Sequence, residues 1–269
     1  MTLTGRRYYA WITLAATALF AFWLDYALRV QLRRAELVTG ISLFAVVLLL
    51  MLFNARKKLP FLPLLSASTW MQIHIYVGLF SCILFGLHTG WRTPHGMFEF
   101  TLAVLFWLVS GSGLVGLAIS RWMPTRLTVH GENVMFERIP ALEVGLRREV
   151  EELVLESVTK SQSTTIADFY ELKLRKYFMK SNGFWYHVAG HGKPLFKLQS
   201  EVRALDRYLN AQEKEIMGSI NDRILAKDNL DFQRACQGLL KGWLFVHIPL
   251  TYSMIIVATV HGFMAWKIS

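Results

Sequence analysis

The sequence is poor in cysteine. Only two occur in 269 residues, Cys82 inside an apolar block and Cys236 far downstream. Neither belongs to a C-x-x-C pair, the spacing typical of iron–sulfur clusters, zinc ribbons and redox dithiols. We therefore expect the chain to carry none of these groups on its own cysteines.

Charged residues are also sparse, at 18% of the chain, whereas 54% is hydrophobic and the mean hydropathy is +0.35. The apolar residues gather in five blocks almost free of charge, at 8–28, 37–53, 70–90, 98–119 and 243–266. A helix of about 20 apolar residues matches the ~30 Å hydrocarbon core of a bilayer. The sequence thus predicts an all-α membrane bundle with five transmembrane helices rather than a soluble domain.

Basic residues exceed acidic ones, 29 against 19, which gives a net charge of +10. Such an excess is compatible with nucleic-acid binding, but here the basic residues cluster at the ends of the apolar blocks. These are Arg6, Arg7, Arg33, Arg34, Arg56, Lys57, Lys58 and Arg121. That placement suits lipid head groups. We expect a multi-pass membrane protein (of the inner, cytoplasmic membrane if the source is bacterial) that contacts membrane lipid and no nucleic acid.

A more polar stretch separates the fourth and fifth blocks. It divides the chain into residues 1–120 with four transmembrane helices, a soluble insertion at 121–238, and a fifth transmembrane helix at 239–269. A modest bias of Lys and Arg favours a cytoplasmic insertion. We predict a small α+β domain there: a hairpin at 127–137, a helix at 140–158, strand-like sequence at 184–197, and a charged helix from Glu201, broken near 228–231, that leads into the last span.

Four of the eight histidines lie inside apolar blocks: His74 and His88 in the third, His247 and His261 in the fifth. An ionisable side chain in hydrocarbon costs a few kcal/mol even on insertion scales, so each is a functional candidate. For any single histidine, a hydrogen bond to a neighbouring helix is an equally good explanation.

The spacing of these histidines favours a functional role over a simple hydrogen bond to a neighbouring helix. Both pairs are fourteen residues apart, which is ~1400°, within ~40° of four full turns, and a rise of ~21 Å. Each pair therefore lies on one helix face. The third and fifth spans cross in the same direction, because one span lies between them. We expect His74 to face His247 and His88 to face His261, the layout that two bis-imidazole b haems require.

The flanking residues support this hypothesis. Trp70 and Trp243 each precede a histidine in the pattern W-x-x-x-H-I, and tryptophan is typical of the membrane interface. The fourth block contains S-G-S-G-L-V-G at 110–116, where small residues allow close approach of a planar cofactor or of another helix backbone.

On these four histidines the chain resembles the two-haem membrane cytochromes b. The spacing is similar to that in the cytochrome b subunit of respiratory quinol–cytochrome c oxidoreductases, and the use of the third and fifth spans to the ferric-reductase-like transmembrane family. The resemblance covers residues 70–120 and 240–265 and implies that His74, His88, His247 and His261 are axial ligands. The chain departs from the reductases in having no Gly-rich nucleotide fingerprint, no flavin-binding barrel and a larger insertion.

The resulting hypothesis is a dihaem b-type cytochrome that passes electrons across the membrane as a subunit of an oxidoreductase or electron-transfer system. A redox partner protein (of iron–sulfur, flavin or cytochrome c type) or a quinone would exchange electrons with it, and quinol or metal reductase activity with partners stays open. Two other hypotheses compete: a proton or ion transporter that uses the histidines as a relay without haem, and a membrane-anchored assembly protein whose insertion is the working part.

Candidates for haem propionates or a quinone are weaker, since charges at helix ends are equally typical of topology signals. The set is Arg92 and His95 on the outer side and Arg121 and Lys241 on the inner side, with Arg34, Lys267, Arg56 and Lys57 as further members. His187 and His191 form H-x-x-x-H, a spacing that binds zinc on a helix. The Gly-containing segment around them favours a structural role instead.

Overall fold

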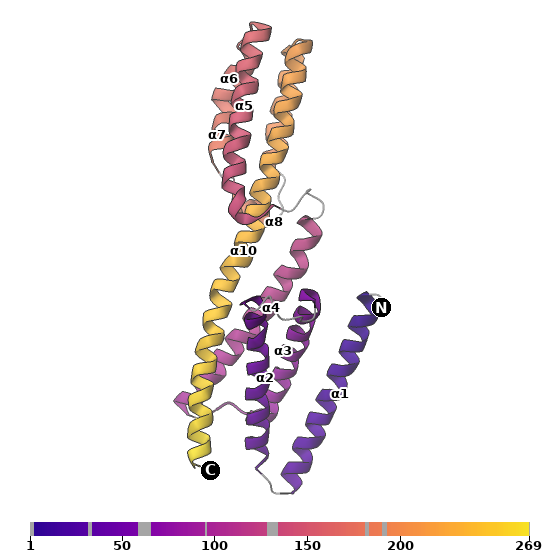
Figure 1. Ribbon diagram of the computed structural model, residues 1–269, viewed down its shortest axis with the longest axis vertical. Helices are drawn as coiled ribbons and strands as arrows, with labels where there is room; N and C mark the ends of the chain where they lie inside the picture. Colours follow the sequence, from indigo (N-terminus) through magenta and orange to yellow (C-terminus); the bar gives the residue numbers. More distant parts are fainter. Residues whose placement is uncertain are drawn as a thin grey trace. The chain divides into compact units, whose positions relative to one another are not determined.

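The structure is a computed structural model that describes residues 3–31, 34–58, 66–94, 96–127, 134–180, 183–189 and 193–268. Its contacts divide the chain into two units (Figure 1), which we call the span unit, Met1–Ala118 with Trp243–Ser269, and the insertion unit, Ile119–Gly242. The sequence-based boundaries at 120/121 and 238/239 lie a few residues from these. The cytoplasmic location of the insertion stays a prediction.

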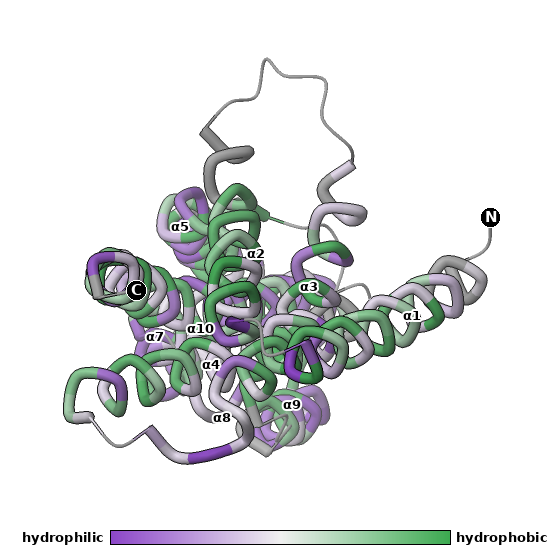
Figure 2. The backbone as a smooth tube through the Cα atoms, turned by 90° about the horizontal axis from the view of Figure 1, so that it is seen from below, coloured by the Kyte–Doolittle hydropathy of each residue, from purple (hydrophilic) through white to green (hydrophobic). Residues whose placement is uncertain are grey.

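Five helices in the described part of the chain are long and apolar enough to cross a membrane. They are α1 (Leu3–Val30), α2 (Ala35–Lys58), α3 (Ala67–Thr89), α4 (Met97–Leu127) and α10 (Ala211–Ile268). Figure 2 shows hydrophobic residues along most of α1, α2 and α4. The prediction of five helices with the length and apolar composition of membrane spans is confirmed.

The span unit has a buried apolar centre to which four helices contribute. Val47 of α2, Phe106 of α4 and Met254 of α10 are almost fully buried there. The ring of Phe85 on α3 stacks on Phe106 with 4.2 Å between ring centres. We call these side chains the central apolar layer.

The described residues of the insertion unit form helices joined by short turns, with no strand among them, so they do not support the predicted α+β insertion. Besides the end of α4 and the first part of α10, its elements are η1 (Phe136–Arg138), α5 (Ile139–Ser161), α6 (Thr165–Phe169), the π-helical η2 (Tyr170–Leu174), α7 (Arg175–Met179), α8 (Phe184–Ala189), α9 (Lys193–Leu205) and η3 (Asp206–Tyr208). Of the expected hairpin at 127–137, residues 128–133 lie outside the described residues, and 136–138 form a helical turn.

The strand expected at 184–197 is instead α8 and the start of α9. Aromatic and β-branched residues favour strands, but burial here follows helical spacing. On α8, His187 is buried against the ring of Phe232. On α9, Leu195, Leu198 and Val202 recur at three- and four-residue steps and pack on the core of the unit. Tertiary packing thus overrides the local propensity.

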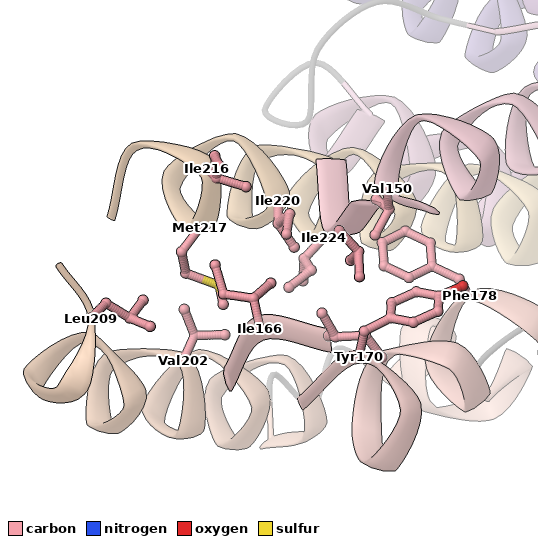
Figure 3. Packing of buried hydrophobic residues seen from close by; sticks show 12 residues of the cluster. Val150, Ile166, Tyr170, Phe178, Val202, Leu209, Ile216, Met217, Ile220 and Ile224 are labelled. Atoms are coloured by element: carbon pink, nitrogen blue, oxygen red, sulfur yellow. The ribbon is translucent and has the colours of Figure 1, made fainter. Parts of the chain in front are cut away.

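That core consists of aliphatic and aromatic side chains from α5, α6, η2, α7, α9 and α10. Figure 3 shows Ile166 opposite Met217 and Ile220 of α10, and the ring of Tyr170 near Phe178. Ile166, Ile220 and Ile224 are fully buried. The core places the long first part of α10 at the centre of the insertion unit.

The expected break near 228–231 is absent, because α10 is one helix from Ala211 to Ile268. Its charges there are paired inside the unit. The ammonium of Lys227, 1% exposed, donates to Asp231 at 2.6 Å and to Glu143 of α5 at 3.2 Å, and Arg234 donates to Glu143 at 2.6 Å. Asp231, at the position of the expected break, therefore belongs to a buried ion cluster inside a continuous helix.

Candidate functional site

The four histidines lie on α3 and α10 of the span unit, and all are half-buried. The structure brings His88 and His261 together, with ring centres 6.3 Å apart and ring planes inclined by 81°. The ring of Phe98 on α4 lies beside His261, also at 6.3 Å. His74 shares α3 with His88, and His247 shares α10 with His261, fourteen residues away in each case. The structure thus brings the rings of His88 and His261 together, and the pairing of His74 with His247 stays a prediction.

The Nδ1 atom of His88 is held by the backbone of α2. It lies 3.0 Å from the carbonyl oxygen of Glu36. A carbonyl oxygen only accepts, so Nδ1 must carry the hydrogen and the lone pair of Nε2 is left for a ligand. The ring packs on Gly40, where a Cβ atom would lie 2.8 Å from His88 Cε1. Glycine at position 40 is what allows this close approach.

A similar relationship recurs fourteen residues along α2. The Leu50 carbonyl is the backbone acceptor facing His74, although Nδ1 of His74 makes no hydrogen bond there. The indole Nε1 of Trp70, one turn before His74, is likewise buried without an acceptor. A small cavity of about 10 Å³ lies beside these two nitrogens, between α2 and α3, and Leu50, Phe53, Trp70 and His74 are among the residues that line it. The indole N–H of Trp70 is therefore buried without an acceptor, next to the ring of His74.

On α10 the ring nitrogen of His247 has a hydrogen-bond partner on α4. The Nδ1 atom of His247 lies 2.7 Å from the hydroxyl oxygen of Ser112, and that hydroxyl donates to the Val109 carbonyl at 2.8 Å. With the hydroxyl hydrogen on the Val109 carbonyl, Nδ1 of His247 is the donor to Ser112. The lone pair of Nε2 is again left for a ligand.

The glycine-rich segment of α4 receives α10 side chains. The ring of Trp243 lies so close to Gly116 that no Cβ atom fits there, and its Nε1 donates to the Ser112 carbonyl at 2.7 Å. It also stacks on His247, with 5.1 Å between ring centres. A Cβ atom added to Gly113 would lie 3.8 Å from His247 Cε1. The small residues thus allow the close approach of α10 side chains.

Sequence reasoning missed several contacts of the site. It gave no role to Gly40 or to the carbonyl of Glu36, and it treated Ser112 only as a small residue and not as a hydrogen-bond partner. Asp25 is a further case, because a charge near a helix end suggests a side chain that reaches solvent. Instead it is 8% exposed and accepts from Arg29 at 2.8 Å, while Arg29 donates to the Leu87 carbonyl at 3.1 Å.

The weaker candidates are dispersed. Arg92 is exposed in the turn after α3, and His95 and His191 lie outside the described residues. Arg121 and Lys241 belong to the insertion unit. Lys241 donates to Glu137 at 2.5 Å, and this hydrogen bond lowers the pKa of that carboxyl. Roles in holding propionates or a quinone stay predictions.

Among the described side chains, no three His, Cys, Asp or Glu residues converge as they do around an ion held by protein ligands alone. A bis-histidine haem differs, since it takes two ligands from the protein. Comparisons with protein-family models, with curated proteins and with solved structures find no match for this chain. The case for a function therefore rests on the geometry of the site.

Proposed function

We propose that the chain is an electron-transfer subunit that holds two b haems, one between His88 and His261 and one between His74 and His247. We call His88 and His261 the outer pair and the haem proposed between them the outer haem. The distance between the two rings of this pair is the main support for the proposal. Metal–imidazole bonds are about 2 Å long, and a ring nitrogen lies about 1.2 Å from its ring centre, so two axial imidazoles in line have centres about 6.4 Å apart. The rings of His88 and His261 are 6.3 Å apart.

The hydrogen bonds of the Nδ1 atoms support the same proposal. Histidines that bind a metal through Nε2 donate the other N–H to a carbonyl, carboxylate or water, which fixes the tautomer and raises the basicity of the ligand. His88 meets the Glu36 carbonyl in this way, and His247 meets the Ser112 hydroxyl. Both rings are therefore prepared to bind iron before any haem is present.

The residues between the two levels support electron transfer over proton transfer. Met254 lies seven residues from both His247 and His261, in the central apolar layer with Val47 and Phe106. These side chains exclude water and exchange no protons, so a histidine relay would have to cross them. Bound haems would supply reversible one-electron reduction at two levels ~21 Å apart along the helices.

The origin of the electrons follows from what the sequence contains. With no nucleotide fingerprint, no flavin-binding barrel and no cysteine pair, the chain has no group of its own that accepts a hydride. We infer that a redox partner protein or a quinone exchanges electrons with it. The membrane lipid contacts its five apolar helices.

Single substitutions of the histidines test the proposal. His88→Ala and His261→Ala should each remove the outer haem and leave one haem per chain, with the same remaining spectrum and midpoint potential. His74→Ala and His247→Ala should leave the other haem. A proton relay without haem predicts no spectral change in any of the four variants, and a result of that kind would contradict the proposal.

A further inference from the structure

Aromatic side chains of the insertion unit gather where α10 leaves it. The rings of Phe136 and Phe184 both cover Gly238 of α10, where a Cβ atom would lie 3.9 Å and 3.6 Å from them. The Lys241 ammonium lies 4.1 Å above the ring of Phe136. We call Met135, Phe136, Phe184, Trp185 and Lys241 the aromatic face.

Hydrogen bonds from α10 hold this face in place. The backbone N–H of Val134 donates to Gln233 at 2.8 Å, and its carbonyl accepts from Gln237 at 2.7 Å. These two side chains, one helical turn apart, fix the segment that carries Met135 and Phe136. On the other side, Trp185 packs edge-on against Phe184 with 5.2 Å between ring centres. The face is therefore a specific structure and not a loose chain end.

The aromatic face is exposed although it is apolar. Trp185 is 74% exposed, Met135 64% and Phe184 40%. Contiguous exposed apolar side chains are typical of surfaces that contact a partner or a membrane. The insertion unit thus presents these side chains to something other than its own core.

The position of the face along the chain indicates its partner. Gly238 lies five residues, or ~7.5 Å along α10, before Trp243, the first residue of the last apolar block. Ile119, where α4 enters the insertion unit, packs against Phe232, Cys236 and Leu239 of the same stretch of α10. Both crossings of the chain therefore lie at this end of the insertion unit.

The composition agrees with an interfacial location. Tryptophan with lysine and arginine is the combination that membrane interfaces favour, since the rings lie among head groups and the long cations reach phosphates. Arg121 and Arg138 are exposed on the same unit. We propose that the aromatic face docks on the lipid head-group layer of the membrane that the apolar helices enter, independently of haem binding.

Fluorescence quenching in vesicles tests this docking. The starting protein is the full-length Cys82→Ala variant. Its remaining Cys236 is fully buried and is expected to stay unlabelled, which labelling of this variant alone verifies. Trp185→Cys then carries an environment-sensitive dye. Tyr208→Cys is the matched control, an aromatic position 80% exposed and three residues before α10 begins. The vesicles contain phosphatidylcholine with a minority of phosphatidylglycerol, with or without nitroxide-labelled head groups.

We expect the dye at position 185 to be quenched several-fold more strongly by the nitroxide lipids than the dye at position 208. Equal quenching at the two positions, or none at 185, would overturn the proposal. A blue-shifted but unquenched dye at 185 would overturn it as well, because protein and not lipid would then cover the face. Met135→Cys repeats the measurement if Trp185→Cys does not fold.

Discussion

The hydroxyl of Ser112 on α4 connects to the ring of His247 on α10 through a hydrogen bond of 2.7 Å. With its hydrogen on the Val109 carbonyl, the hydroxyl oxygen accepts from Nδ1 of the histidine. This relationship orients the ring and leaves Nε2 unprotonated. His88 has a different partner for the same purpose, the peptide carbonyl of Glu36.

Substitution of Ser112 by Ala should therefore change one haem and not the other. A hydrogen bond from the ligand makes it more basic and stabilises ferric iron, so its removal should raise the midpoint potential of the haem bound to His247. We expect a rise on the order of 60 mV, the one-electron equivalent of a tenfold change. Potentiometric titration measures both potentials. Ser110→Ala, in the same S-G-S-G segment, is the control, and equal shifts in both haems would contradict this role.

Gly40 should be required for the outer haem. In Gly40→Ala the new methyl group would lie 2.8 Å from Cε1 of His88, so the ring must move away from the Glu36 carbonyl. We expect loss or spectral change of the outer haem alone, measured as the reduced-minus-oxidised difference spectrum. Gly78→Ala on α3 is the matched control, since nothing lies within 4 Å of its added Cβ. An intact spectrum in Gly40→Ala would show that this contact does not position His88.

The buried indole N–H of Trp70, which has no acceptor beside His74, predicts an ordered water. A water molecule in the small cavity would accept from Trp70 Nε1 and His74 Nδ1 and donate to the Leu50 carbonyl, which gives it the usual three partners. An experimental density map at high resolution should show it, and Trp70→Phe should weaken it. A map that shows no water beside Trp70 Nε1 would contradict this expectation.

Lys227 should stabilise the insertion unit because it neutralises the buried carboxylates of Asp231 and Glu143. Lys227→Met leaves the buried Asp231 without its lysine, which we expect to cost about 3–5 kcal/mol of unfolding free energy. Lys227→Met with Asp231→Leu should recover most of it, because apolar residues replace the pair. Thermal unfolding of the full chain in detergent measures both variants. Lys160→Met, which breaks an exposed pair with Glu156, should leave the melting temperature nearly unchanged.

The histidine arrangement depends on little more than helix geometry, which is why the sequence predicts it. Two pairs with equal spacing on two spans of equal direction define two levels without knowledge of any neighbouring helix. The apolar helices follow from composition in the same way. Neither inference needs the packing of side chains.

The partners of the histidines depend on that packing and were not predictable. The Glu36 carbonyl has no side-chain signature, and it faces His88 only because of the register between α2 and α3. Ser112 is one of two serines in S-G-S-G, and the rotation of α10 against α4 decides which one meets His247. The cavity beside Trp70 is likewise a result of helix packing.

The error at 184–197 has a local cause. Phe184, Trp185 and Tyr186 favour a strand by propensity. Burial of His187 against Phe232, together with the hydrogen bond from its backbone N–H to the Gly183 carbonyl, instead selects a helical turn. Burial against α10 is a long-range contact, and single-sequence propensity contains no information about it.

Haem content of the purified wild-type protein tests the central claim most directly. Membranes expressing the full chain in a haem-competent host should yield protein with two b haems per chain by pyridine haemochrome assay, and redox titration should resolve two midpoint potentials. A fully folded preparation without haem, or with haem that persists when all four of His74, His88, His247 and His261 are replaced by Ala, would contradict the account.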